Sequence, residues 1–143
     1  MDNSIWVKMH GGTTHFPIAL AMAATLFDLA SIVAPDNPQQ TRRSAFRAAG
    51  FYTLILGAFG SFAAVASGLI ISYGNLWGRG DLARHHLFVW PSFALLVGLA
   101  AWRMALTSHC SQGVSRLYLT VSVAVCGLMG AAGYYGGELL VHG

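Results

Sequence analysis

Long apolar stretches alternate with short polar ones along the chain, and this pattern predicts its architecture. The apolar stretches hold at most one charged side chain each and cover residues 16–34, 48–73, 87–106 and 117–141. At 1.5 Å of rise per residue, about 20 residues of helix cross the roughly 30 Å hydrocarbon core of a bilayer. The third stretch reaches residue 106 only with Arg103 snorkelling toward the interface. The short connectors favour antiparallel neighbours. We therefore predict an all-α, integral membrane four-helix antiparallel bundle, one domain over residues 1–143.

Composition excludes the other broad classes of protein. Hydrophobic residues make up 55 % of the chain and charged residues 9 %, with a mean hydropathy of +0.57. A soluble domain carries about 25 % charged residues, and a disordered chain has low hydrophobicity. The net charge of +3 comes from scattered basic residues without a basic patch, which excludes a nucleic-acid binder. We expect membrane lipid to be the surrounding partner.

The basic residues also predict the orientation of the chain in the membrane. The first and third connectors carry Arg42, Arg43, Arg47, Arg103 and Arg116, whereas the opposite side carries Lys8, Arg79 and Arg84. Positive residues are enriched on the cytoplasmic side of membrane proteins. The count favours both termini outside, which in a bacterial inner (cytoplasmic) membrane is the periplasmic side.

An even number of crossings places most of the histidines on one side of the membrane. His10 and His15 precede the first predicted helix, His85 and His86 precede the third, and His142 follows the fourth. Five of the six histidines therefore share the side that bears both termini, and only His109 lies opposite. A lone imidazole at an interface is commonly a solvated polar residue, but five in one layer favour a ligand site.

The residues around this layer suit a planar cofactor. Helical bundles can hold haem between histidines on facing helices. Arg79 and Arg84 are placed to meet the propionates, since arginine recognises carboxylates in a bidentate manner. Gly136 and Gly137 would let a backbone approach the ring, although glycines in membrane helices also serve close helix packing. Glu138 could orient His142 from one turn away.

The intramembrane acid Asp28 lies about 20 Å along the first helix from His15, so it does not belong to the histidine layer. Acids inside a membrane pair with bases or polar backbone groups. We expect Asp28 to pair with Arg47 or Arg103, or to cap a neighbouring helix.

Two segments resemble a known family. They are the run His10-Gly-Gly-Thr-Thr-His15-Phe16-Pro17-Ile18-Ala19-Leu20 and the ending Gly136-Gly137-Glu138-Leu139-Leu140-Val141-His142-Gly143. Together with Asp28 and a histidine after the second helix, they resemble the bacterial membrane proteins grouped as domain of unknown function 2231 (DUF2231), over nearly the whole chain. The resemblance implies a small four-helix membrane protein in which His10, His15, one of His85 and His86, and His142 occupy the family's histidine positions. Gly11 departs from the proline that the family commonly has there.

These observations predict a membrane-bound b-type cytochrome-like electron-transfer subunit rather than an enzyme by itself. It would pass electrons between the quinone pool and a redox partner protein or a membrane complex on the side of the termini. Two of His15, His86 and His142 would bind the iron of haem b, with His10 and His85 as supporting groups or as ligands of another metal.

Two other functions remain open on the sequence. One is a non-haem metal-binding or transport protein that uses the same histidines with Glu138 for copper, zinc or non-haem iron. The other is a structural anchor subunit of a larger membrane complex, in which the glycine faces matter and the histidines do not.

Overall fold

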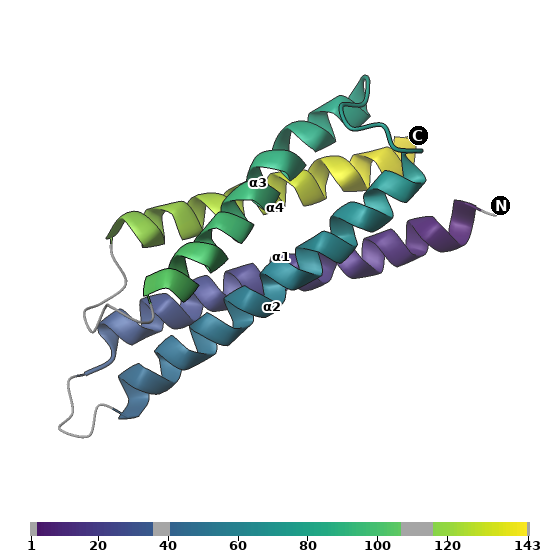
Figure 1. Cartoon of the computed structure of the whole chain (residues 1–143). Helices are drawn as coiled ribbons and strands as arrows, with labels where there is room; N and C mark the ends of the chain where they lie inside the picture. The colour runs from purple at the N-terminus through teal and green to yellow at the C-terminus, as the bar shows by residue number, and fades with distance from the viewer. Residues whose placement is uncertain (1–2, 36–40, 107–115, 143) are drawn as a thin grey trace.

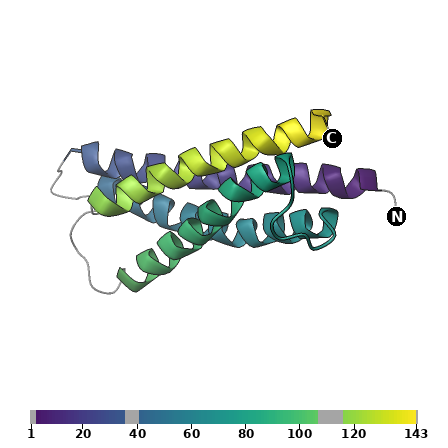
Figure 2. The same cartoon turned by 90° about the horizontal axis from the view of Figure 1, so that it is seen from above.

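Four long antiparallel helices make up the fold of the protein, as the prediction required (Figure 1). The computed structural model describes residues 3–35, 41–106 and 116–142. The helices are α1 (Asn3–Val33), α2 (Thr41–Ile71), α3 (Asp81–Leu106) and α4 (Arg116–His142). Each is long and apolar enough to cross a membrane. The start of α1 and the end of α4 lie at the same end of the bundle (Figure 2).

Three of the helices begin at least six residues earlier than the apolar stretches predicted. α1 begins at Asn3 instead of residue 16, α2 at Thr41 instead of 48, and α3 at Asp81 instead of 87. His10, His15, His85 and His86 therefore lie inside helices rather than before them. Hydropathy marks only the part of a helix inside the hydrocarbon, whereas the helix continues through the interface because its backbone groups still need hydrogen bonds.

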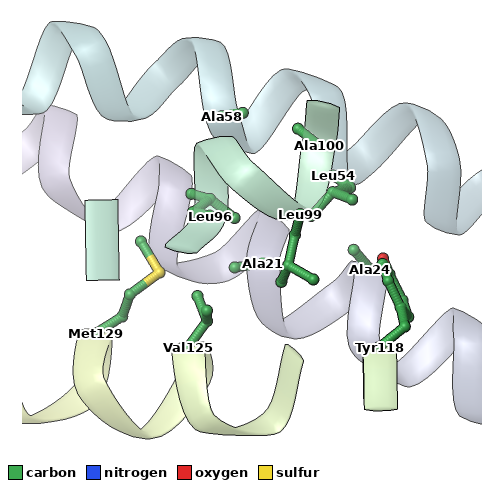
Figure 3. Packing of buried hydrophobic residues seen from close by; sticks show 10 residues of the cluster. All are labelled: Ala21, Ala24, Leu54, Ala58, Leu96, Leu99, Ala100, Tyr118, Val125 and Met129. Carbon is green, nitrogen blue, oxygen red and sulfur yellow. The ribbon is translucent and has the colours of Figure 1, made fainter. Parts of the chain in front are cut away.

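The helices pack as two hairpins, α1 with α2 and α3 with α4. Contacts within each hairpin are more extensive than contacts between the hairpins. Small and branched side chains fill the centre, where Ala21, Leu54, Leu96 and Val125 meet from the four helices (Figure 3). Small residues let membrane helices approach closely.

The outer surface of the bundle is as apolar as its interior. Phe59 is 70 % exposed and Val33 81 % exposed, whereas the hydroxyls of Thr25 and Ser122 are buried. A soluble bundle has the opposite pattern, with polar side chains outside. The spans of this protein therefore present their large apolar side chains to lipid.

Two groups of inward-facing residues lie near the two ends of the bundle, eighteen residues apart on every helix. The histidine layer consists of His10, Gly68, His85 and Gly136, and the carboxylate layer consists of Asp28, Gly50, Arg103 and Tyr118. Eighteen residues are five helical turns, so both layers lie on the same side of each helix, about 27 Å apart. This separation is close to the roughly 30 Å hydrocarbon thickness of a bilayer, so a bilayer centred on the bundle would have one layer near each interface.

Candidate functional site

His10 on α1 is held against α2 through its Nδ1 atom. That nitrogen lies 2.8 Å from Ser67 Oγ. The Ser67 hydroxyl donates to Ala64 O at 2.9 Å, so the serine oxygen accepts the hydrogen of His10 Nδ1. Thr13 donates to His10 O at 3.0 Å, and its hydroxyl oxygen lies 3.2 Å from Ser67 Oγ. This network assigns the hydrogen of the neutral ring to Nδ1 and the lone pair to Nε2.

His85 on α3 is held against α4 in the same way. Its Nδ1 atom lies 2.9 Å from Ala132 O. A backbone carbonyl can only accept a hydrogen bond, so Nδ1 carries the hydrogen and Nε2 carries the lone pair. Histidines that bind metals have this arrangement, because the hydrogen bond on one nitrogen fixes the tautomer and the orientation of the ring.

A glycine on the neighbouring helix makes room for each of these rings. A Cβ atom at Gly68 would lie 3.0 Å from His10 Cε1, and one at Gly136 would lie 3.1 Å from His85 Cε1. Both imidazoles therefore rest directly on a helix backbone. The two hairpins therefore share one arrangement, which we call a seat. In each, a histidine of the first helix lies over a glycine of the second helix and donates from Nδ1 to an oxygen of that helix.

His86 completes the group of histidines. Its ring centroid is 5.8 Å from that of His85 and 6.1 Å from that of Trp90. Only 8 % of His86 is exposed, and its Nδ1 atom has no hydrogen-bond partner among the described residues. His10 on α1 lies at the level of His85 on α3, because each is eighteen residues along its own helix from the carboxylate layer. The histidine layer thus joins imidazoles from both hairpins.

His15 does not join this group. Its side chain is exposed, and five residues of helix turn it about 140° away from His10 around α1. The backbone of His142 belongs to the last turn of α4, while its side chain lies outside the part of the chain that the structure describes. His109 also lies outside the described residues. Of the three histidines predicted as iron ligands, only His86 is seen at the layer.

The other predicted site residues differ in their surroundings. Arg79 and Arg84 are exposed, and Arg84 Nη1 lies 3.1 Å from Asp81 Oδ1 in a surface ion pair. Gly136 lies under His85, whereas nothing lies within 4 Å of a Cβ atom placed at Gly137. Of these two glycines, Gly136 is therefore the one that makes room for a histidine ring.

Sequence reasoning missed the oxygens that hold the two rings. Ser67 and Gly68 are adjacent in a stretch that is otherwise apolar. A hydroxyl next to a glycine was the sequence feature that could have indicated where the ring of His10 lies. The oxygen for His85 is a backbone carbonyl, that of Ala132, which leaves no mark in a sequence.

The carboxylate layer is a buried ion pair that joins all four helices. Asp28 is 0 % exposed and accepts a hydrogen bond from Arg103 Nη1 through Oδ2. Arg103 also donates to Tyr118 OH at 3.0 Å and to Arg47 O at 2.9 Å. The predicted pairing of Asp28 is confirmed for Arg103. A Cβ atom at Gly50 would lie 2.6 Å from Asp28 Oδ1, so this oxygen packs against the backbone of α2.

The arrangement limits which metals the described side chains could bind. Among the described residues, no three or more His, Cys, Asp or Glu side chains are grouped so that they could hold a metal ion. The histidine layer provides His10 and His85 from separate hairpins, and His86 lies beside His85.

Comparison with known families agrees with the architecture. A family model described as a predicted membrane protein (DUF2231) matches residues 7–143. The chain belongs to the DUF2231 family. No curated protein and no solved structure matches it. This DUF2231 member is thus a four-helix membrane protein, and its chemistry has to be argued from its own residues.

Proposed function

We propose that this DUF2231 protein binds haem b, which His10 of one hairpin and His85 of the other would hold, and that it carries electrons within the membrane. One observation supports the proposal above the others. Each of the two imidazoles donates from Nδ1 to an oxygen of its own hairpin and keeps a lone pair on Nε2. A haem with two histidine ligands needs two imidazoles of this kind, each with its orientation fixed and a lone pair open for the iron.

The donor set fits haem better than a bare metal ion. Protein sites for zinc commonly use three or four side chains, and copper sites likewise combine several. The described residues hold no such group. Haem needs only axial ligands from the protein, because the porphyrin supplies the equatorial nitrogens. This comparison favours haem over the copper, zinc and non-haem iron alternatives.

The residues of the chain would tune and protect the site. Haem, when bound, supplies a one-electron iron couple. Ser67 and the carbonyl of Ala132 hold the two imidazoles in one orientation. Gly68 and Gly136 allow the rings to rest on the helix backbones, and Trp90 packs beside His86 at the end of the layer. Such fixed surroundings limit the rearrangement that accompanies electron transfer.

The topology supports a location for electron exchange. The histidine layer lies at the end of the bundle that bears the start of α1 and the end of α4. The opposite end carries the larger share of arginines, so the histidine layer would face the periplasm in a bacterial cytoplasmic membrane. There the protein would serve as an electron-transfer subunit between the quinone pool and a redox partner, and not as an enzyme by itself.

The test is the cofactor content of the purified protein after expression with sufficient haem. We expect haem b equimolar with the chain, measured as the pyridine haemochrome, in the natural sequence and in His15→Ala. We expect loss of low-spin haem in His10→Ala and in His85→Ala, with helix content by circular dichroism showing that both variants fold. Bound metal without porphyrin in elemental analysis would support the non-haem alternative instead. Neither metal nor porphyrin would support the structural anchor.

A further inference from the structure

A groove lies at the other end of the bundle, between the end of α1 and the start of α2. Its volume is about 460 Å³ and it is open to the outside. Among the described residues, Arg42 is the charged residue of its lining, and the others are Ala30, Val33, Ala34, Pro35, Ala45 and Phe46. A volume of this size is in the range of ligand-binding clefts.

The three arginines at the start of α2 have different partners. Arg43 Nη2 donates to Ala34 O at 2.9 Å and so caps the end of α1. The carbonyl of Arg47 accepts the hydrogen bond from Arg103. The Arg42 side chain is exposed and has no hydrogen bond or ion pair with any described residue. Because α2 begins at Thr41, the positive end of its helix dipole adds to the charge of Arg42.

The depth of the groove matches the headgroup region of a bilayer. The carboxylate layer lies near one edge of the hydrocarbon, and the groove walls from Ala30 to Ala34 lie just beyond Asp28 on α1. Arg42 precedes Gly50 by eight residues, which is about 12 Å of helix further out. A bilayer is about 40–45 Å thick with its headgroups, against about 30 Å for its hydrocarbon. By this count the apolar walls lie at the depth of the lipid glycerol, and the backbone of Arg42 lies at the outer edge of the headgroups. The Arg42 side chain, which lines the groove, would therefore have to extend back toward the membrane to meet a phosphate.

We propose that this groove binds an anionic phospholipid, with the phosphate on Arg42 and the first part of an acyl chain against the apolar walls. Charge complementarity supports an anion, and the lining supports a chain attached to it. The site does not depend on haem, because it lies at the opposite end of the bundle from the histidine layer.

The experiment measures lipid binding to the full-length protein, purified in a neutral detergent and freed of lipid. Phosphatidylglycerol, phosphatidylcholine and glycerol phosphate are added separately, and binding is followed by native mass spectrometry and by the midpoint of thermal unfolding. We expect phosphatidylglycerol to bind more tightly than phosphatidylcholine and to raise the midpoint, and glycerol phosphate to have no effect. Arg42→Gln should weaken binding of phosphatidylglycerol about fivefold, the effect of one surface cation on an anionic lipid.

Matched variants distinguish binding in the groove from non-specific electrostatic attraction between the protein and anionic lipid. Arg116→Gln removes an exposed arginine at the start of α4, outside the groove, and should keep the affinity. Ala45→Phe fills the groove without changing charge and should weaken binding, whereas Ala48→Phe changes an exposed residue outside the groove and should not. Equal weakening by Arg42→Gln and Arg116→Gln, or equal stabilisation by glycerol phosphate, would overturn the proposal.

Discussion

The two polar layers of this protein lie on the same inward faces of the same four helices, yet their polar atoms are used differently. In the carboxylate layer, Arg103 donates to Asp28, Tyr118 and the carbonyl of Arg47, and the second oxygen of Asp28 packs against Gly50. The donors of that layer are directed at acceptors within the chain. In the histidine layer, each of two half-buried rings has one nitrogen bonded and one with a free lone pair. The carboxylate layer joins the four helices, with Asp28 Oδ1 as its one buried oxygen that has no hydrogen-bond partner among the described residues. The histidine layer is where the proposed ligand would bind.

The largest effect is expected from breaking the ion pair of the carboxylate layer. Arg103→Met leaves Asp28 buried without its cation, and loss of one partner of a buried pair costs about 3–5 kcal/mol in the free energy of unfolding. The double variant Asp28→Leu with Arg103→Met removes both charges and should recover most of that loss. Denaturant unfolding in micelles measures both. A double variant as unstable as the single one would show that the pair is not the source of the cost.

A smaller effect is expected from filling the backbone contact beneath Asp28. Gly50→Ala places a methyl group 2.6 Å from Asp28 Oδ1, and overpacking of this kind costs about 1–3 kcal/mol. Gly98→Ala is the matched control, because nothing lies within 4 Å of a Cβ atom there. Thermal unfolding of the two variants compares them directly. Equal stability of both would mean that α2 can move away from Asp28 without cost.

In the histidine layer the expected effect is on cofactor affinity rather than on folding. Ser67→Ala removes the oxygen that accepts from His10 Nδ1, and loss of such a supporting hydrogen bond weakens metal binding by about 10–100-fold. Haem titration of the stripped protein measures this. Ser72→Ala, which changes the residue directly after the end of α2, should bind haem as the natural sequence does. An unchanged affinity in Ser67→Ala would remove His10 from the proposed site.

The smallest effect is expected at His15. Its side chain is exposed and has no contact with the two seated rings, so His15→Ala should change the free energy of unfolding by less than about 0.5 kcal/mol. Haem content should also stay unchanged. Loss of haem in this variant would show that a pair drawn from His15, His86 and His142, the three candidates predicted from the sequence, describes the protein better than His10 and His85 do.

The sequence predicted what depends on hydropathy and on the number of crossings. These determine the four antiparallel helices, the shared end of the termini, and the side on which the histidines gather. They do not determine the rotation of each helix, and rotation is what separates the seated His10 from the exposed His15. Hydropathy placed the start of α1 at residue 16, so both histidines were predicted to lie before the helix. The side of the helix that each one faces could therefore not be predicted.

The carboxylate layer was easier to predict than the histidine layer. A carboxylate inside a membrane needs a cation at its depth, and few were available, so Arg103 was among the expected partners of Asp28. An imidazole can be satisfied by any oxygen. The carbonyl of Ala132 has no sequence signature, and its role follows only from the packing of α3 against α4.

The most direct test of the account asks whether imidazoles from the two hairpins reach one iron. Electron paramagnetic resonance of the oxidised, haem-loaded protein reports the spin state of that iron. A low-spin signal is predicted for the natural sequence and for His15→Ala, and a high-spin signal for His10→Ala and for His85→Ala. A low-spin signal that persists in both of these single variants, or a protein that takes up no haem, would contradict the central claim.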